Sequence, residues 1–196
     1  MEDHIKTYES NLLEGYEKRK TICFSDKARD TNTEKIGILA PSVIFLISGF
    51  LLTKMTAVQY LTVVLLIPFI PAYIILHEAI HGAVYQLLTG QKFQIGRGKQ
   101  GFYCILPQIY VYSRTQMLCA AAPLVVLTLL LVSLNVAVII NGSGLFLLLS
   151  LLLAFHFFAC RGDIYLIKEL YSMKDDRLLI CEDEDGNNIV FGSHIK

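Results

Sequence analysis

Acidic side chains are nearly absent from the middle of this sequence. Of the 17 Asp and Glu residues, eight precede Lys35, eight lie from Asp163 onward, and the one between them is Glu78. Charged residues make up 17% of the 196 residues and hydrophobic residues 54%. Ordinary soluble domains are about 25% charged, so this composition excludes that class. It predicts an integral membrane protein.

Three further features that the sequence lacks narrow the range of possible functions. The five cysteines are odd in number and contain no C-x-x-C pair, so neither a disulfide framework nor a cysteine zinc site is indicated, and we interpret them as small buried hydrophobic residues. The net charge is zero and no long block of like charge occurs, which argues against nucleic acid as a partner. The first 35 residues are hydrophilic, so we expect no cleavable signal peptide.

Four apolar segments are each about as long as the ~20 residues that a helix needs to cross the hydrocarbon core. They cover residues 36–53, 57–89, 116–140 and 144–170. The sequence therefore predicts an all-α integral membrane fold of about four transmembrane helices. We assign this membrane core to residues 36–171, between a cytoplasmic N-terminal segment, 1–35, and a cytoplasmic tail, 172–196.

The orientation follows from the positive charges, because cytoplasmic loops carry the excess of Lys and Arg. The N-terminal segment holds seven, the loop 90–115 holds four and the segment from Arg161 onward holds five. The two alternate loops hold one, Lys54, and none. Both termini are therefore expected in the cytoplasm, with the lipid bilayer of a plasma membrane around the core.

Three segments outside the spans have patterns of their own. Apolar residues recur at spacings of three and four in residues 5–20, which predicts an interfacial amphipathic helix or, equally, a plain surface helix. The stretch "GRGKQG" at 96–101, flanked by aromatic and branched residues, predicts a short hairpin between spans two and three. The stretch "EDEDGNN" at 182–188 separates two apolar patches and predicts a small hairpin or a partly ordered extension.

The stretch "LHEAIHGAV", residues 76–84, places two histidines and Glu78 inside the second apolar segment. Ionisable residues at this depth are costly and usually functional. On a helix, His77 and His81 lie one turn apart on one face, so both imidazoles can bind one zinc ion. Glu78 is then the candidate general base that takes a proton from water, and Gly82 would let another backbone approach. The structural alternative is a pair of histidines satisfied by backbone carbonyls or neighbouring helices.

A catalytic zinc site usually has three protein ligands, and Asp163 is the predicted third. His77 and Asp163 lie about 20 and 19 residues from the starts of two segments that run in the same direction, so at ~1.5 Å per residue they reach a similar depth. An ordinary interfacial acid is the alternative interpretation of Asp163. His156, two turns earlier, is a candidate contact for substrate or oxyanion, or a structural histidine. Glu169 is a weaker alternative ligand.

These motifs together resemble a small bacterial family of zincin-type membrane peptidases. The resemblance covers about residues 60–170 and rests on "HEAIHG", the glycine-rich loop, a third segment with Pro123 and the Gly-Asp pair at 162–163. More distantly, the sequence is similar to the site-2 protease class of intramembrane metalloproteases.

In the site-2 class, two histidines and a later aspartate bind zinc, and the glutamate activates water. The resemblance implies these roles for His77, His81, Asp163 and Glu78. The aspartate departs from the pattern of that class, because it follows Arg-Gly and precedes isoleucine instead of lying in an asparagine-proline-aspartate-glycine or leucine-aspartate-glycine motif.

We therefore expect a zinc-dependent peptidase that cleaves peptide or transmembrane protein substrates within or at the edge of the membrane. The hairpin at 93–112 is expected to offer an edge strand to an unwound substrate. The alternatives are an inactive zinc-binding protein that binds a partner, or a zinc-dependent membrane hydrolase of another substrate. A metal transporter is disfavoured, because it needs polar residues on several spans and only Glu78 and Asp163 are available. The sequence leaves the substrate and the oligomeric state open.

Overall fold

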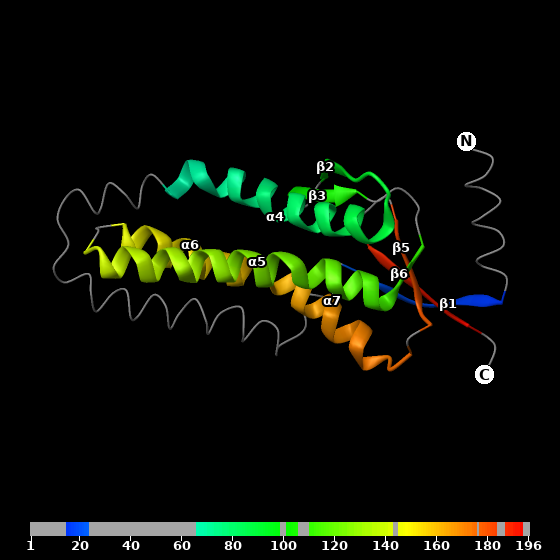
Figure 1. The fold of residues 1–196 in the computed structure, drawn as a ribbon. Helices are drawn as coiled ribbons and strands as arrows, with labels where there is room; N and C mark the ends of the chain where they lie inside the picture. The colour runs from blue at the N-terminus through cyan, green and yellow to red at the C-terminus, as the bar shows by residue number, and fades with distance from the viewer. Residues whose placement is uncertain are drawn as a thin grey trace.

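The computed structural model describes residues 15–23, 66–98, 101–105, 110–142, 145–175, 177–183 and 187–193. The predicted first span, 36–53, and the start of the second lie outside these residues. The described helices are α4 (Leu66–Thr89), α5 (Ser113–Ile140), α6 (Phe146–Ala159) and α7 (Arg161–Ser172). Figure 1 shows α4 and α6 beside α5, the longest of these helices.

Two parts of the described chain are long and apolar enough to cross a membrane. They are α5 and the stretch Phe146–Ser172 that α6 and α7 form together. They correspond to the predicted third and fourth spans. The described part of the predicted second span is α4, so these residues support two of the four expected membrane helices.

The fourth predicted span is divided in two. α6 ends at Ala159 and α7 begins at Arg161, with Cys160 between them. The sequence changes character here, because α6 is almost entirely apolar whereas α7 carries charged residues and Gly162, a weak helix former. In Figure 1, α7 turns away from the direction of α6. Asp163 therefore lies in the first turn of a new helix.

The predicted hairpin between the second and third spans is present. Strands β2 (Gln94–Gly98) and β3 (Gly101–Ile105) pair antiparallel, with Gly98 opposite Gly101. The hairpin packs against α4 at Gly82, where an added Cβ would lie 2.1 Å from the Phe93 ring. The atoms nearest to Gly82 are thus those of an aromatic ring, and the close approach of a second backbone stays a prediction.

A four-stranded antiparallel sheet lies at one end of the helices, so the fold is mostly helical and not purely all-α. Its strand order is β1 (Tyr16–Ile22), β6 (Asn188–Ser193), β5 (Leu179–Glu182) and β4 (Val111–Tyr112). The hairpin predicted around "EDEDGNN" is present, because β5 and β6 pair on either side of it.

Residues 16–20 belong to strand β1 and not to the predicted helix over 5–20. Gly15 has a φ of +87°, a left-handed conformation, and begins the strand with a turn. Tyr16 then pairs with Ser193 and Ile22 with Asn188. Pairing with a distant strand has overridden the helical spacing. The remaining residues of the predicted helix, 5–14, lie outside the described ranges.

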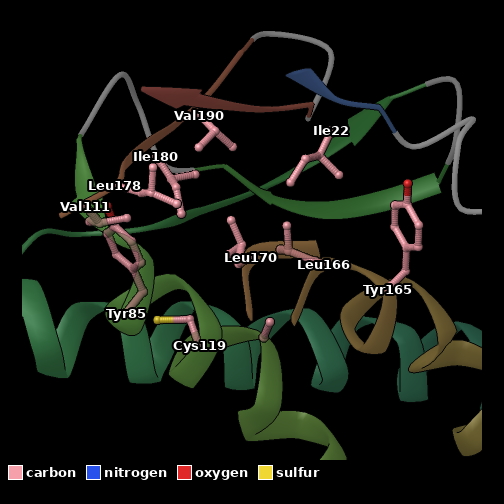
Figure 2. Close-up of a cluster of buried hydrophobic side chains, with 11 residues drawn as sticks. Ile22, Tyr85, Val111, Cys119, Tyr165, Leu166, Leu170, Leu178, Ile180 and Val190 are labelled. Atoms are coloured by element: carbon pink, nitrogen blue, oxygen red, sulfur yellow. The ribbon is translucent and has the colours of Figure 1, made fainter. Parts of the chain in front are cut away.

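The main hydrophobic core lies between the sheet and the helices (Figure 2). Tyr85 of α4 and Leu166 and Leu170 of α7 meet side chains from the sheet end of the chain, including Leu178 and Val190. Leu178 and Val190 are both 0% exposed. The described part of the C-terminal tail is therefore part of the core.

Replacing Leu178 should test this packing. Leu178→Ala removes a fully buried side chain, and such changes cost about 2–5 kcal/mol because they leave a cavity. We expect a lower unfolding temperature for the full-length protein in detergent. The matched control is Leu129→Ala, because Leu129 is 64% exposed on α5. Equal losses for the two variants would contradict the assigned core.

Candidate metal centre

Helix α4 brings the two motif histidines together. His77 and His81 lie one turn apart, with ring centroids 4.8 Å apart and Nε2 atoms 3.1 Å apart. His77 is buried, and the side chain of His81 is 15% exposed. Two imidazole nitrogens thus face each other inside the fold.

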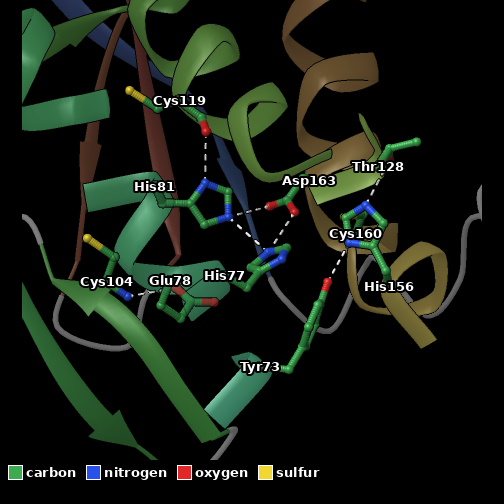
Figure 3. Close-up of polar contacts among 10 residues, drawn as sticks. All are labelled: Tyr73, His77, Glu78, His81, Cys104, Cys119, Thr128, His156, Cys160 and Asp163. Carbon is green, nitrogen blue, oxygen red and sulfur yellow. Dashed lines mark hydrogen bonds and ion pairs between the residues drawn. The ribbon is translucent and has the colours of Figure 1, made fainter. Parts of the chain in front are cut away.

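Helix α7 adds a carboxylate to this pair. Asp163 Oδ2 lies 3.2 Å from His77 Nε2, and Oδ1 lies 3.3 Å from His81 Nε2. The Asp163 side chain is 17% exposed. Figure 3 shows the carboxylate directed between the two rings. We call His77, His81 and Asp163 the metal centre.

The spacing of these donor atoms fits a zinc ion. Zinc bonds of about 2.0–2.1 Å to nitrogen and oxygen, at tetrahedral angles, separate neighbouring ligand atoms by roughly 3.3–3.4 Å. The observed separations of 3.1, 3.2 and 3.3 Å are close to this value. Two neutral imidazoles and one carboxylate are also a common donor set for catalytic zinc. The residues present therefore fit this metal.

A backbone carbonyl contacts the His81 ring on the side away from the other two residues of the metal centre. Its Nδ1 lies 2.8 Å from the backbone carbonyl oxygen of Cys119 on α5. Because a carbonyl only accepts, Nδ1 carries the proton and Nε2 keeps its lone pair for a metal. Metal-binding histidines usually have such an outer partner, which fixes the orientation of the ring.

Glu78 lies at the edge of the metal centre. Its carboxylate oxygen and one ligand nitrogen each from His77 and His81 lie within 4.8 Å of one another. The backbone N–H of Cys104, in β3, donates a hydrogen bond of 2.9 Å to Glu78 Oε2. The hairpin thus holds the candidate general base in place.

Cys104 acts here through its backbone. Burial, together with the nearby carboxylates of Glu182 and Glu78, raises the pKa of the Cys104 thiol to about 12. The thiol is therefore protonated at neutral pH.

Of the two alternative residues from the sequence, Glu169 lies away from the metal centre and His156 lies near His77. Glu169 forms an ion pair with Lys20 of β1, away from the metal centre. His156 is fully buried, and one ligand atom each from His156, Cys160 and His77 lie within 4.8 Å of one another. His156 belongs to α6 and Asp163 to α7, so the two residues lie on either side of the helix break at Cys160.

Sequence reasoning missed three side chains around His156. The Tyr73 hydroxyl contacts His156 Nδ1, Thr128 Oγ1 lies 2.9 Å from Nε2, and Cys160 Sγ lies 3.5 Å from Nδ1. Tyr73 precedes His77 by one helical turn, which was a usable signal. Thr128 and Cys160 gave no such sequence signal, because an isolated threonine or cysteine in an apolar segment has no distinctive spacing.

The centre therefore has the make-up of a catalytic zinc site, with three candidate ligands and an adjacent glutamate. A family model described as "Putative zincin peptidase" matches residues 70–178, more than half of the 196-residue chain. The chain belongs to this family, and the matched range includes every residue of the metal centre. Comparison with curated proteins and with solved structures gave no match. The predicted zincin family is confirmed, whereas the likeness to site-2 proteases stays a prediction.

Zinc affinities of variants should distinguish the proposed ligands from the proposed general base. Asp163→Ala removes a proposed ligand, so we expect zinc affinity to fall by more than the 10–100-fold typical of losing an outer partner. Glu78→Gln should keep the affinity, because Glu78 is not among the proposed ligands. Competition with a coloured chelator on purified protein measures both.

Glu169→Gln is the matched control, since Glu169 is an acid of the same helix that pairs with Lys20. It should bind zinc as the wild type does. Unchanged affinity in Asp163→Ala would remove Asp163 from the ligand set.

Proposed function

We propose that the protein is a zinc-dependent peptidase that hydrolyses peptide bonds of membrane-associated substrates, within or at the edge of the bilayer. The observation that carries this proposal is the convergence of His77, His81 and Asp163, with Glu78 beside them. Membership of the zincin peptidase family supports the reaction class.

Each residue of the centre has a chemical role in the proposed reaction. His77, His81 and Asp163 would hold a zinc ion, which supplies a Lewis acid that activates water and polarises the scissile carbonyl. Glu78 takes a proton from the attacking water and delivers it to the leaving amine. The Cys104 N–H orients Glu78, and the Cys119 carbonyl orients His81. Contact of His156 with substrate or oxyanion, expected from the sequence, stays a proposal.

The surface of α5 supports a membrane location. Ten large hydrophobic side chains of this helix are exposed, each by at least 41%. They are Leu118, Val125, Val126, Leu129, Leu130, Val132, Leu134, Val136, Ile139 and Ile140. Lipid contact would remove these side chains from water, and large exposed apolar surfaces are rare on soluble monomers.

The sheet end of the molecule is the proposed cytoplasmic side. Strand β1 exposes three consecutive basic residues, Lys18 to Lys20, and positive charge is enriched on the cytoplasmic side of membranes. Asp163 lies in the first turn of the charged helix α7, which packs against this end. This arrangement supports cleavage near the cytoplasmic edge of the bilayer.

Glu78→Gln tests the proposed reaction directly. The amide cannot act as a base, and general acid–base catalysis contributes typically 10²–10⁴-fold, so we expect a loss of about that size. The measurement is cleavage of a transmembrane reporter in liposomes that contain the full-length protein. Glu169→Gln should cleave at the wild-type rate. Wild-type cleavage by Glu78→Gln, with zinc bound, would refute the assigned general base.

The hairpin supports a mode of substrate binding. Strand β3 pairs with β2 on one side, and its Cys104 N–H points the other way, toward Glu78. Amides on one edge of a strand alternate, so the N–H of Phe102 belongs to this same outer edge. An extended substrate strand paired here would lie beside the general base, and a helical substrate would have to unwind to bind.

Phe102→Pro should weaken this pairing. Proline removes the outward N–H and spares the hydrogen bonds to β2, and a net hydrogen bond is worth about 0.5–1.5 kcal/mol. We expect kcat/KM for an extended peptide substrate to fall roughly 2- to 10-fold, with zinc affinity unchanged. Phe102→Ala is the control, because it removes the side chain and keeps the amide. Equal kcat/KM for the two variants would exclude pairing at this amide.

A further inference from the structure

Helix α4 carries a third polar side chain on the face of the two histidines. Tyr73 lies one helical turn before His77, and the centroids of the two rings are 6.2 Å apart. Tyr73 is 6% exposed and packs edge-on against Phe155 and His156 of α6, at centroid distances of 5.4 and 6.0 Å. A contact that fixes the Tyr73 side chain therefore also limits the rotation of α4 at His77.

His156 joins the Tyr73 hydroxyl to helix α5 (Figure 3). The hydroxyl contacts His156 Nδ1, and Thr128 Oγ1 lies 2.9 Å from Nε2. A neutral imidazole has one donor and one acceptor nitrogen, and hydroxyl groups can do either, so both hydrogen bonds form together. Three helices thus meet through one ring.

The same ring lies at the start of the helix that carries Asp163. Cys160 Sγ lies 3.5 and 3.8 Å from the two ring nitrogens of His156, so the thiol packs beside the ring. Cys160 is the residue between α6 and α7, and Asp163 lies in the first turn of α7. His156 and Cys160 are both 0% exposed. The ring therefore contacts α4, α5 and the junction between α6 and α7.

The metal centre depends on the relative position of these elements. His77 and His81 come from α4, whereas Asp163 comes from α7. Ligands from separate helices keep the spacing of a metal site only when the helices cannot rotate or slide against each other. A site fixed in this way binds its metal more tightly, because less order has to be imposed when the ion binds.

We infer that His156 is a positioning residue for the metal centre. Through the Tyr73 hydroxyl it sets the rotation of α4, and through Thr128 and Cys160 it holds α4 in place against α5 and the beginning of α7. The inference rests on the proposed function, since it concerns the assembly of the site proposed to bind zinc. Both ring nitrogens are engaged and the side chain is fully buried, so His156 acts through these neighbours.

The zinc affinity of the full-length protein in detergent, measured by competition with a chelator, tests this inference. Tyr73→Phe removes only the hydroxyl, and we expect zinc affinity to fall roughly 2- to 10-fold, the equivalent of one net hydrogen bond. His156→Leu removes both hydrogen bonds and should lower the affinity further. His156→Gln should restore most of it, because the amide offers a donor and an acceptor. Tyr73→Phe keeps the inference testable if His156→Leu fails to fold.

Ser150→Ala is the matched control. Ser150 Oγ donates a hydrogen bond of 3.0 Å to Asn135 Oδ1, which joins α6 to α5 as the contact between His156 and Thr128 does. Both residues are buried, and Ser150 lies about 9 Å along α6 from His156. Losing this bond should lower the unfolding temperature and leave zinc affinity at the wild-type value. Contacts that only stabilise the helix bundle would behave in this way.

The inference is overturned by either of two results. One is wild-type zinc affinity in Tyr73→Phe, which, combined with slower cleavage, would point to contact with substrate instead. The other is a zinc affinity of His156→Gln no higher than that of His156→Leu, which would assign the effect to packing of the ring. Failure of the proposed peptidase is a separate observation, namely a wild type that binds zinc and does not cleave, and it leaves these affinities unchanged.

Discussion

The contact between one carboxylate and two imidazoles is the constraint on which the rest of this structure depends. Asp163 and the two histidines of α4 are mostly removed from water, and a carboxylate in such a place is costly unless positive charge or a metal compensates it. The carboxylate belongs to α7, which begins after a change of direction at Cys160 and leaves the line of the preceding apolar helix (Figure 1).

The elements around the centre each contribute one backbone atom to it. Helix α5 supplies the carbonyl oxygen that orients His81, and the β2–β3 hairpin supplies the N–H that holds Glu78. Backbone atoms in regular elements are well fixed, so the ligand and the base keep their positions without long polar side chains. Packing of the hairpin on Gly82 then links the position of the base to the ligand helix. A membrane protein with few charged residues can build a polar site in this way.

The polar groups behind His77 extend this site into the apolar bundle. Tyr73 of α4, Thr128 of α5 and Cys160, between α6 and α7, all contact the buried imidazole of His156. Polar groups inside an apolar bundle are retained when they satisfy one another or bind something. The partnerless nitrogen of His77 means that the described hydrogen bonds alone do not complete this network.

The spacing of residues along the chain was enough to predict some of the elements and candidate site residues of this protein. The interval of four residues between His77 and His81 places both on one face of a helix. The glycine-rich turn sequence predicted one hairpin, and the acidic one predicted a hairpin or a partly ordered extension, because these patterns depend on neighbours along the chain. Two other features could likewise be recognised without knowing which residues are in contact. They are the low number of charged residues between Lys35 and Arg161 and the zincin motif. The depth argument identified Asp163 as a candidate, and its role as a ligand stays a prediction.

The tertiary structure decided whatever depends on distant partners. Residues 16–20 form a strand because β6, near the other end of the chain, offers them a pairing edge, and no short window contains that information. Packing of α6 against the other helices placed His156 near His77, a contact that no spacing along the chain indicates. The backbone groups of Cys104 and Cys119 have no sequence signature, since every residue carries the same amide. The sequence by itself thus determined which residues could do chemistry, and long-range packing decided which of them meet.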